Sequence, residues 1–200
     1  MYLLLKNILD RFCSGVALVF ISPVLLLIAL WIKADSKGPV IYRQERIGRG
    51  GHPFWLFKFR TMRPASDREG LLTVGGRDHR ITRAGYFLRK TKLDELPQLW
   101  NVLKGDMSIV GPRPEVAKYV QLYNEDQRKV LLVKPGLTDL ASLRYFDEST
   151  LLAQSADPEQ TYIREIMPAK LELNREYIEK QSFGMDLRII FRTLRRIVMG

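Results

Sequence analysis

The sequence predicts an α+β protein that is mainly helical, with a membrane-associated segment at residues 1–34 and a compact domain at residues 35–200. Three observations support this fold class. Residues 12–32 carry no charged side chain and are long enough to cross a bilayer, which takes about 20 residues. Two short segments rich in aromatic and β-branched residues flank a glycine-rich turn at 48–51, which indicates a small β-hairpin. Apolar side chains recur at helical spacing in much of the remaining chain.

The formal net charge of +10 is concentrated in one part of the chain. Residues 33–115 contain 17 lysines and arginines against 9 aspartates and glutamates, so +8 of the excess lies there. Such a segment favours anionic partners, which are nucleic acid, lipid headgroups or a phosphorylated substrate. The apolar run at 12–32 argues strongly against a nucleic-acid binder. His52 and His79 are the only histidines and Cys13 the only cysteine, which is too few for a metal cluster of these ligands.

The apolar segment is interrupted at its middle by Ser22 and Pro23. Proline at this position removes the hydrogen bond to the carbonyl of Val19 and its ring crowds that turn, so a kink is expected. The hydroxyl of Ser22 can satisfy part of the freed backbone. The segment then forms either a kinked spanning helix or a helix–break–helix hairpin that enters and leaves on one side. Cationic residues flank both ends, which hints at the hairpin, but the residues alone leave both topologies open.

Residues 40–44 and 54–60 are predicted to form the two strands of the β-hairpin. Side chains alternate between the faces of a strand, so the second strand has an aromatic face and a mixed face. The mixed face carries Lys58 and Arg60, which either point together at a phosphate or line a solvated strand face. The glycines at 48–51 are not a dinucleotide-binding fingerprint, because an aromatic strand follows them instead of a helix. The aromatic face carries Trp55, Phe57 and Phe59.

A short helix is predicted around an adjacent carboxylate pair, Asp94 and Glu95. Gly105 is a natural end for this helix, and Pro97 is tolerated only in its first turn, so the helix begins at or near Asp94. This start places both carboxylates at the positive end of a helix, where backbone N–H groups also favour a bound phosphate. The predicted buried stripe of the helix contains Leu96, Leu99, Trp100 and Leu103.

The segments on either side of this helix are predicted from their turn residues. The polar, glycine-containing residues 64–76 are expected to form a mobile loop, and a short helix then ends near Lys92. Residues 111–114, Gly-Pro-Arg-Pro, form a stiff turn that presents Arg113. Residues 116–133 are predicted to form one helix that ends at a Lys-Pro-Gly sequence.

Residues 185–199 have the pattern of an amphipathic helix. Apolar side chains share one face, and arginines lie on the flanks and back. This pattern is typical of a helix that lies in a membrane interface, and its alternative is a core-packing helix with snorkelling arginines. The apolar segment at 12–32 favours the interface. The shared apolar face contains Leu187, Ile190, Phe191, Leu194, Ile197 and Val198.

Three stretches of this chain closely resemble the bacterial sugar transferase family, the monotopic phosphoglycosyl transferases that start lipid-linked glycan assembly. They are residues 89–114, Phe-Lys-Phe-Arg-Thr-Met at 57–62, and Asp-His-Arg-Ile-Thr-Arg at 78–83. The resemblance runs from near residue 6 to Thr138. It implies that residues 1–34 form a re-entrant membrane hairpin broken at the Ser-Pro pair, and that residues 35–200 form a catalytic domain on the cytoplasmic face of the bacterial inner membrane.

The resemblance also implies roles for the carboxylate pair. The first acidic residue, Asp94, matches the family nucleophile and would have Mg²⁺ beside it, as magnesium suits oxygen ligands and phosphates. Glu95 matches the second member of the dyad, as metal support or proton handler. The basic residues assigned to phosphate binding are Lys58, Arg89 and Arg113, which match family positions, together with Arg60 from the strand pattern.

The implied reaction moves a sugar 1-phosphate from a UDP-sugar to polyprenyl (undecaprenyl) phosphate and releases UMP. It runs in two steps through a phosphosugar held covalently on Asp94, and it would be the first membrane step of O-antigen, capsule, exopolysaccharide or glycoprotein assembly. The partners are then the UDP-sugar, the polyprenyl phosphate and membrane lipids, with no nucleic acid. The rival hypothesis is a non-catalytic basic scaffold at the membrane surface, which does not explain the clustered cations and carboxylates.

The resemblance weakens from Asp139 onward, where family members often continue with Gly-Trp-Ala-Gln-Val-Asn-Gly-Arg. A different sequence stands here, so no sugar-contacting role is carried onto residues 139–160 and the identity of the sugar stays open. Arg144 in this segment is a tempting substrate cation, but a surface arginine is the favoured interpretation. The sequence also leaves the oligomeric state open, with a homodimer as one option.

Overall fold

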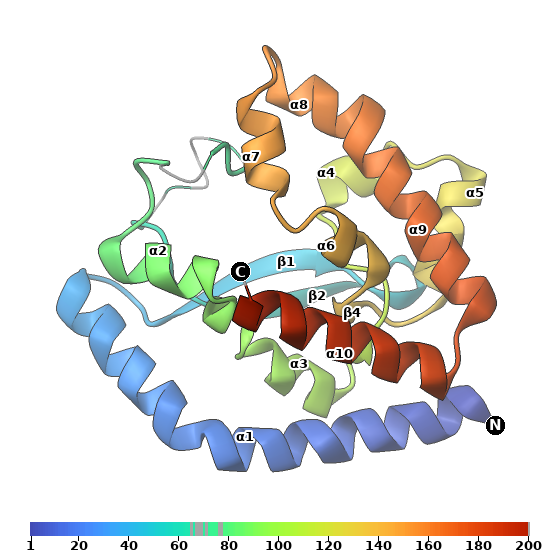
Figure 1. Cartoon of the computed structure of the whole chain (residues 1–200), viewed down its shortest axis with the longest axis horizontal. Helices are drawn as coiled ribbons and strands as arrows, with labels where there is room; N and C mark the ends of the chain where they lie inside the picture. Colours follow the sequence, from blue (N-terminus) through green and yellow to red (C-terminus); the bar gives the residue numbers. More distant parts are fainter. Residues whose placement is uncertain (65, 67–69, 71, 76–77, 200) are drawn as a thin grey trace.

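The computed structural model describes residues 1–64, 66, 70, 72–75 and 78–199. The described chain is mainly helical, and its strands form two separate two-stranded sheets (Figure 1). The predicted α+β class, with a long apolar helix and a small sheet, is therefore confirmed. Part of the loop predicted at 64–76 falls outside the described residues.

Helix α1 spans Tyr2–Asp35 and bends near its middle (Figure 1). Pro23 lies inside the helix, and the hydroxyl of Ser22 donates a hydrogen bond of 2.8 Å to the carbonyl of Val19. This is the carbonyl that Pro23 leaves without its usual helical donor, so the compensation predicted from the sequence is present. Within the described chain, α1 is the one helix long and apolar enough to cross a membrane, by length and composition.

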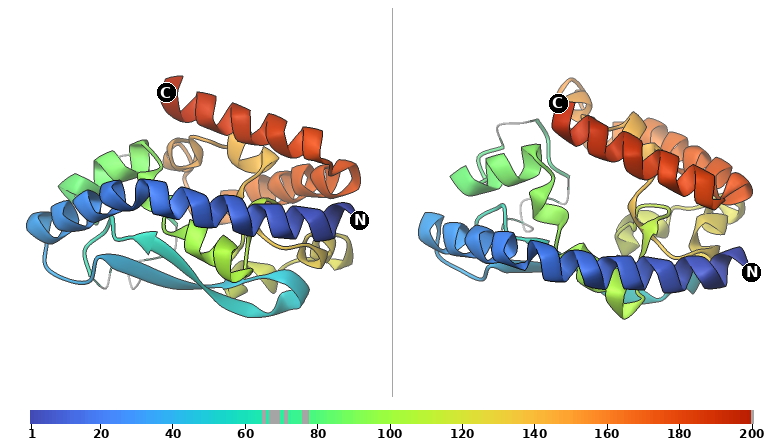
Figure 2. Two further views of the ribbon diagram at one scale, coloured as in Figure 1. Left: turned by 90° about the horizontal axis from the view of Figure 1, so that it is seen from below. Right: turned by 60° about the horizontal axis from the view of Figure 1, so that its bottom comes forward.

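Helix α1 lies against the rest of the protein at both of its ends. It packs mainly on α3 (Gln98–Lys104), with further contacts to α2 (Arg83–Lys90) and to strand β3 (Ser108–Val110). In its C-terminal half, Ile28 and Ile32 are buried in a cluster with Phe59 and Leu88. In the view of Figure 2 (left), α1 runs the length of the molecule, with the β-hairpin on one side of it and α10 (Phe183–Met199) on the other.

The N-terminal end of α1 is held by a buried polar network centred on Asp186. Lys6 Nζ lies 2.8 Å from Asp186 Oδ2 and 3.2 Å from the carboxylate of Asp10. The hydroxyl groups of Tyr2 and Tyr177 also donate to Asp186, at 2.8 and 2.7 Å. Buried charges are tolerated when they are paired and hydrogen-bonded, and here each charged group has a partner on another helix or one turn away.

The predicted β-hairpin is confirmed. Strand β1 (Ile41–Ile47) pairs antiparallel with β2 (Pro53–Phe59), and the 3-10 turn η1 (Arg49–Gly51) connects them. Leu56 from the mixed face and Phe59 from the aromatic face are both buried, so each face of β2 covers part of the core.

The helix predicted at 94–105 starts later than expected. The carboxylate pair lies in a 3-10 turn, η3 (Leu93–Glu95), which follows α2 (Arg83–Lys90), and α3 begins only after Pro97. Gly105 ends α3 in the left-handed conformation, as its position predicts.

The predicted buried stripe of this helix is wrong at Trp100, which is 51% exposed, whereas Asn101 is fully buried. The reason is that α3 lies beside the backbone of β2. The side-chain amide of Asn101 donates a hydrogen bond of 2.7 Å to the carbonyl of Trp55 and accepts one of 3.1 Å from the backbone N–H of Phe57. Buried backbone groups need partners, so a polar side chain faces inward here.

A second sheet was not predicted. Strand β3 (Ser108–Val110) pairs in parallel with β4 (Gly136–Thr138). The backbones approach so closely that a Cβ on Gly136 would lie 2.1 Å from the nitrogen of Gly111, which only glycine avoids. The first residue of β3 donates its hydroxyl to Asp10, which ties this sheet to α1.

The single helix predicted at 116–133 is wrong, because the chain breaks there into short elements. Asn124 starts a new helix with a reciprocal capping box. Its Oδ1 atom accepts a hydrogen bond of 2.9 Å from the backbone N–H of Gln127, and its own backbone N–H donates one of 3.0 Å to Gln127 Oε1. Such a cap gives hydrogen-bond partners to the free backbone N–H groups at the start of a helix, so a new helix begins at Asn124 although the apolar spacing continues through it. The elements are α4 (Ala117–Val120), α5 (Glu125–Arg128) and η4 (Lys129–Leu132).

Residues 140–180 form a helical wall for which no element is predicted from the sequence. Leu152, Tyr162 and Leu171 from this wall pack into one core with Tyr119 and Val130. The exposed position of Arg144 agrees with its interpretation as a surface residue. The elements are α6 (Leu140–Arg144), α7 (Glu148–Ala153), α8 (Pro158–Thr161), the π-helical turn η5 (Tyr162–Ile166) and α9 (Met167–Lys180).

The helix predicted at 185–199 is confirmed as α10 (Phe183–Met199). Its inner face buries Ile189 against Val110 and Tyr177. Much of its apolar face points outward, which is not the arrangement of a core-packing helix. The exposed large apolar residues of α10 are Phe183, Leu187, Phe191, Leu194, Val198 and Met199.

Candidate active site

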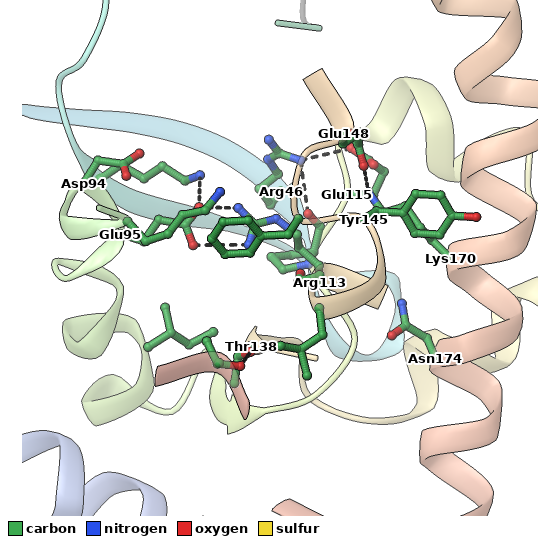
Figure 3. A pocket seen from close by; sticks show the side chains of 18 of the residues that line it. Arg46, Asp94, Glu95, Arg113, Glu115, Thr138, Tyr145, Glu148, Lys170 and Asn174 are labelled. Atoms are coloured by element: carbon green, nitrogen blue, oxygen red, sulfur yellow. Dashed lines mark hydrogen bonds and ion pairs between the residues drawn. The ribbon is translucent and has the colours of Figure 1, made fainter. Parts of the chain in front are cut away.

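A cavity of about 660 Å³ gathers most of the predicted site residues. It lies between the hairpin and η3 on one side and α6, α7 and α9 on the other, with α10 along its edge (Figure 3). A volume of this size suits a small-molecule ligand. Its charged lining residues are Arg46, Lys58, Arg89, Lys92, Asp94, Glu95, Arg113, Glu115, Glu148 and Lys170.

The carboxylate pair reaches this cavity because of the turn between α2 and η3. Lys92 adopts the left-handed conformation, with φ of 57°, and no other described residue except glycine has a positive φ. Backbone strain of this kind is often found at functional sites. The two side chains that follow diverge: Glu95 points toward Arg113, and Asp94 does not (Figure 3).

Glu95 is held by two cations from different elements. Lys58 Nζ lies 3.1 Å from Glu95 Oε1, and the Arg113 guanidinium donates to both carboxylate oxygens, with Nη1 at 3.2 Å from Oε2. Burial alone would raise the pKa of Glu95, but Arg113 and Lys58 outweigh it and hold that pKa well below its usual range. Glu95 is therefore an ionised, fixed residue.

Asp94 has the opposite electrostatic environment. It is 6% exposed, and its Oδ1 atom has no hydrogen-bond partner among the described residues. Burial and the neighbouring charge of Glu95 raise the pKa of Asp94, and Lys58 only partly offsets them. Two adjacent carboxylates are thus driven apart in pKa, which is a common sign of separate chemical roles.

Two further cations have binding capacity left in this cavity. Arg89 Nη2 donates to the hydroxyl of Thr73 at 2.9 Å, and Lys92 Nζ lies 4.9 Å from the centre of the Phe146 ring. Within the described residues, neither Arg89 nor Lys92 forms a salt bridge with a carboxylate. Both remain available for a phosphate, and Lys92 is an addition to the site residues predicted from the sequence.

Arg60 is the predicted site residue that the structure does not bring to the cavity. It is 4% exposed, and its guanidinium donates to the carbonyls of Ser36, Lys37 and Pro39 at 2.6–2.8 Å. These carbonyls follow the C-terminal end of α1, so Arg60 anchors that end of the helix. Strand alternation could not place Arg60 beside Lys58, because Arg60 lies beyond the last residue of β2.

The opposite side of the cavity comes from residues that the sequence reasoning did not select. On α9, Lys170 Nζ lies 2.6 Å from Glu148 Oε2, and Asn174 follows one turn later. On the hairpin side, Arg46 of β1 was likewise not selected, and it pairs with Glu115 at 3.0 Å. Lys170 and Asn174 are four residues apart, so the sequence could show that they share one face of a helix. It could not show that this face points into the cavity.

The family model described as bacterial sugar transferase matches residues 1–200. The chain is 35% identical over 202 residues to UDP-N-acetylgalactosamine-undecaprenyl-phosphate N-acetylgalactosaminephosphotransferase of Aeromonas hydrophila, covering 100% of this chain and 45% of that protein. It is 39% identical over 192 residues to UDP-glucose:undecaprenyl-phosphate glucose-1-phosphate transferase of Klebsiella pneumoniae, covering 94% of this chain and 39% of that protein.

A relative of similar length also matches. The chain is 34% identical over 198 residues to the uncharacterized sugar transferase EpsL of Bacillus subtilis, covering 99% of this chain and 89% of that protein. The chain therefore spans less than half the length of the two larger relatives and most of the length of the shorter one.

Proposed function

This chain belongs to the bacterial sugar transferase family, and we propose that it transfers a sugar 1-phosphate from a UDP-sugar to undecaprenyl phosphate and releases UMP. The observation that carries the proposal is the cavity. It places a buried carboxylate oxygen without a hydrogen-bond partner beside Arg89 and Lys92, which have no carboxylate partner among the described residues. That arrangement suits a reaction between anionic phosphates, in which the protein must position the groups and neutralise their charge.

We propose that Asp94 is the nucleophile. In the first displacement, a carboxylate oxygen of Asp94 attacks the phosphorus that bears the sugar, and the bond from that phosphorus to UMP breaks. The product is an acyl phosphate that carries the sugar on Asp94. In the second displacement, an oxygen of the lipid phosphate attacks the same phosphorus, and the Asp94 carboxylate leaves unchanged.

The cations around Asp94 have distinct parts in this scheme. Arg89 and Lys92 bind the diphosphate, because neither is paired with a carboxylate in the part of the chain that the structure describes. Arg113 forms an ion pair with Glu95, which neutralises much of its positive charge and leaves less of it to stabilise the substrate phosphates. Burial lowers the pKa of Lys58, and the neighbouring charge of Glu95 offsets only part of that effect.

The donor set at Asp94 fits Mg²⁺ bound mainly through substrate. No group of three or more potential metal-ligating side chains occurs among the described residues. Magnesium, however, is usually held by one or two carboxylates together with substrate phosphates, and the unpartnered Oδ1 of Asp94 is suited to that role. When bound, Mg²⁺ would neutralise the negative charge of the diphosphate.

We further propose that the protein sits on the cytoplasmic face of the inner membrane and does not span it. Both ends of α1 support this: Lys6 and Ile32 are buried against the same body of the protein. A helix that crossed the bilayer could not keep both contacts on one side. The outward faces of α1 and α10 are apolar, which suits shallow insertion with the cavity at the level of the headgroups.

The reaction is tested by UMP release. Purified protein is incubated in detergent with Mg²⁺, undecaprenyl phosphate and each of several UDP-sugars. We expect sustained UMP release and a lipid-linked sugar diphosphate with at least one donor. A basic membrane scaffold would release no UMP with any donor, and that result would overturn the proposed activity.

The topology is tested by thiol labelling. Single cysteines are placed beside Met1 and at position 37, in a Cys13→Ser background, and spheroplasts are treated with a membrane-impermeant thiol reagent. Both positions are expected to be shielded until the cells are lysed, because both should face the cytoplasm. Labelling of the N-terminal cysteine alone would mean that α1 spans the membrane.

The variant Pro23→Leu tests whether the bend in α1 keeps both ends on one side of the membrane. It restores a helical N–H for the carbonyl of Val19, so the bend at the middle of α1 loses its cause. We expect the N-terminal cysteine to become more accessible from outside in this variant.

A further inference from the structure

Asn174 is a buried polar residue of the cavity wall that the transfer scheme above does not use. It lies on α9, is 4% exposed, and lines the cavity. Its Oδ1 atom has no hydrogen-bond partner among the described residues. Figure 3 shows its amide directed from α9 toward the interior of the cavity. Because buried amides are normally hydrogen-bonded, this side chain has binding capacity left for a ligand.

The neighbours of Asn174 make this end of the cavity neutral. The adjacent cation, Lys170, is taken up by Glu148 at 2.6 Å, and Tyr145 lies close to that pair (Figure 3). Asp94 lies on the opposite side of the cavity from Asn174 (Figure 3), and the charges of Arg89 and Lys92, which have no carboxylate partner among the described residues, act on Asp94. A phosphate is therefore favoured at the Asp94 end, and among the residues that the structure describes no unpaired cation lies beside Asn174 to bind one.

We propose that the amide of Asn174 recognises the neutral part of the nucleotide-sugar donor. It would accept a hydrogen bond from a sugar hydroxyl or from the imide N–H of uracil while the diphosphate is bound at Asp94. The inference rests on the proposed transferase activity and deepens it, because it assigns donor recognition to the α6–α9 wall. Asn174 is then a substrate-binding residue that does not take part in either displacement.

The test is Asn174→Leu, which keeps the approximate volume of the side chain and removes its hydrogen-bonding atoms. We expect KM for the donor to rise about tenfold or more, because a site built to hydrogen-bond a substrate group loses strongly when that bond cannot form. The kcat at saturating donor should change much less. Asn174→Asp keeps an acceptor oxygen and is expected to recover part of the lost affinity.

Two further measurements identify the group that is bound. If Asn174 contacts a sugar hydroxyl, Asn174→Leu changes the ratio of kcat/KM among UDP-glucose, UDP-galactose and their N-acetylated forms, and leaves inhibition by UMP unchanged. If Asn174 contacts uracil, all donors are weakened by one factor and the inhibition constant of UMP rises by the same factor. Either pattern supports the proposal.

The matched control is Glu179→Leu, which places the same residue at an exposed position of α9. It should leave KM and kcat unchanged. Donor KM, UMP inhibition and donor ratios that are all unaltered in a folded Asn174→Leu protein would overturn the proposal. A loss of kcat alone, with unaltered KM, would also overturn it. Because UMP release persists in each of these cases, failure here is distinct from failure of the proposed transferase activity.

Discussion

Replacing Asp94 with asparagine is expected to lower the rate of phosphosugar transfer by roughly 10³-fold or more, without loss of the fold. The amide has nearly the shape of the carboxylic acid but cannot form the acyl phosphate that the two-step scheme requires. The decisive measurement uses wild-type protein with UDP-sugar and Mg²⁺ but without lipid acceptor. We expect about one UMP per protein molecule, an increase in intact mass of one phosphosugar, and its location on Asp94 by peptide mapping.

Glu95→Gln is the neighbouring control for this experiment. It should lower the turnover but still allow some adduct on Asp94, because Glu95 is paired with Arg113 and Lys58 and is not the attacking group. UMP release that occurs only with both substrates present, with no adduct on any residue, would mean direct transfer and would leave Asp94 as a metal ligand.

The raised pKa of Asp94 also sets the direction of the pH dependence. The nucleophile must be ionised, so the rate should fall as the pH falls through a pKa above the ordinary value of an aspartate. Glu95, with its lowered pKa, stays ionised through that same range.

Asp186→Ala is expected to reduce the free energy of unfolding by roughly 3 kcal/mol, which corresponds to a Tm lower by about 6–12 °C for a chain of this size. The substitution leaves the hydroxyl groups of Tyr2 and Tyr177 without their carboxylate acceptor and removes one of the two partners of Lys6. Thermal unfolding in detergent, followed by circular dichroism, measures the effect.

The double variant Lys6→Met with Asp186→Leu is the control. Replacing a buried ion pair by apolar residues of similar size is often close to neutral, so the part of the loss that comes from Lys6 should return, whereas the part that comes from the hydroxyl groups of Tyr2 and Tyr177 should remain. The remaining carboxylate, Asp10, keeps its hydrogen bond from Ser108. A Tm for Asp186→Ala within about 2 °C of wild type would show that this network does not hold α1 to the body.

Features that depend on local sequence could be predicted without the structure. The hairpin follows from two short strands and a glycine turn, and the compensation at Ser22 follows from what proline does to one carbonyl three or four residues earlier. The carboxylate pair Asp94 and Glu95 could also be recognised from local sequence, because the cations and the proline that mark it lie within a few residues of it in the chain. The amphipathic pattern of 185–199 likewise predicted a helix with an outward apolar face.

Features that depend on contacts between distant segments could not be predicted in this way. Trp100 is exposed and Asn101 is buried, the reverse of the prediction, because the backbone of β2 lies beside α3. The sequence of the helix does not show that β2 is its neighbour. For the same reason, the sequence could not show that Arg60 donates to backbone carbonyls after the end of α1 instead of lining the cavity.

The second half of the cavity shows this division most clearly. The sequence by itself determined the carboxylates, the cations beside them and the apolar segments. Only the tertiary structure placed α9 across the cavity from η3 and turned Asn174 inward. A helical period states which residues share a face, but the packing of the whole chain decides what that face meets.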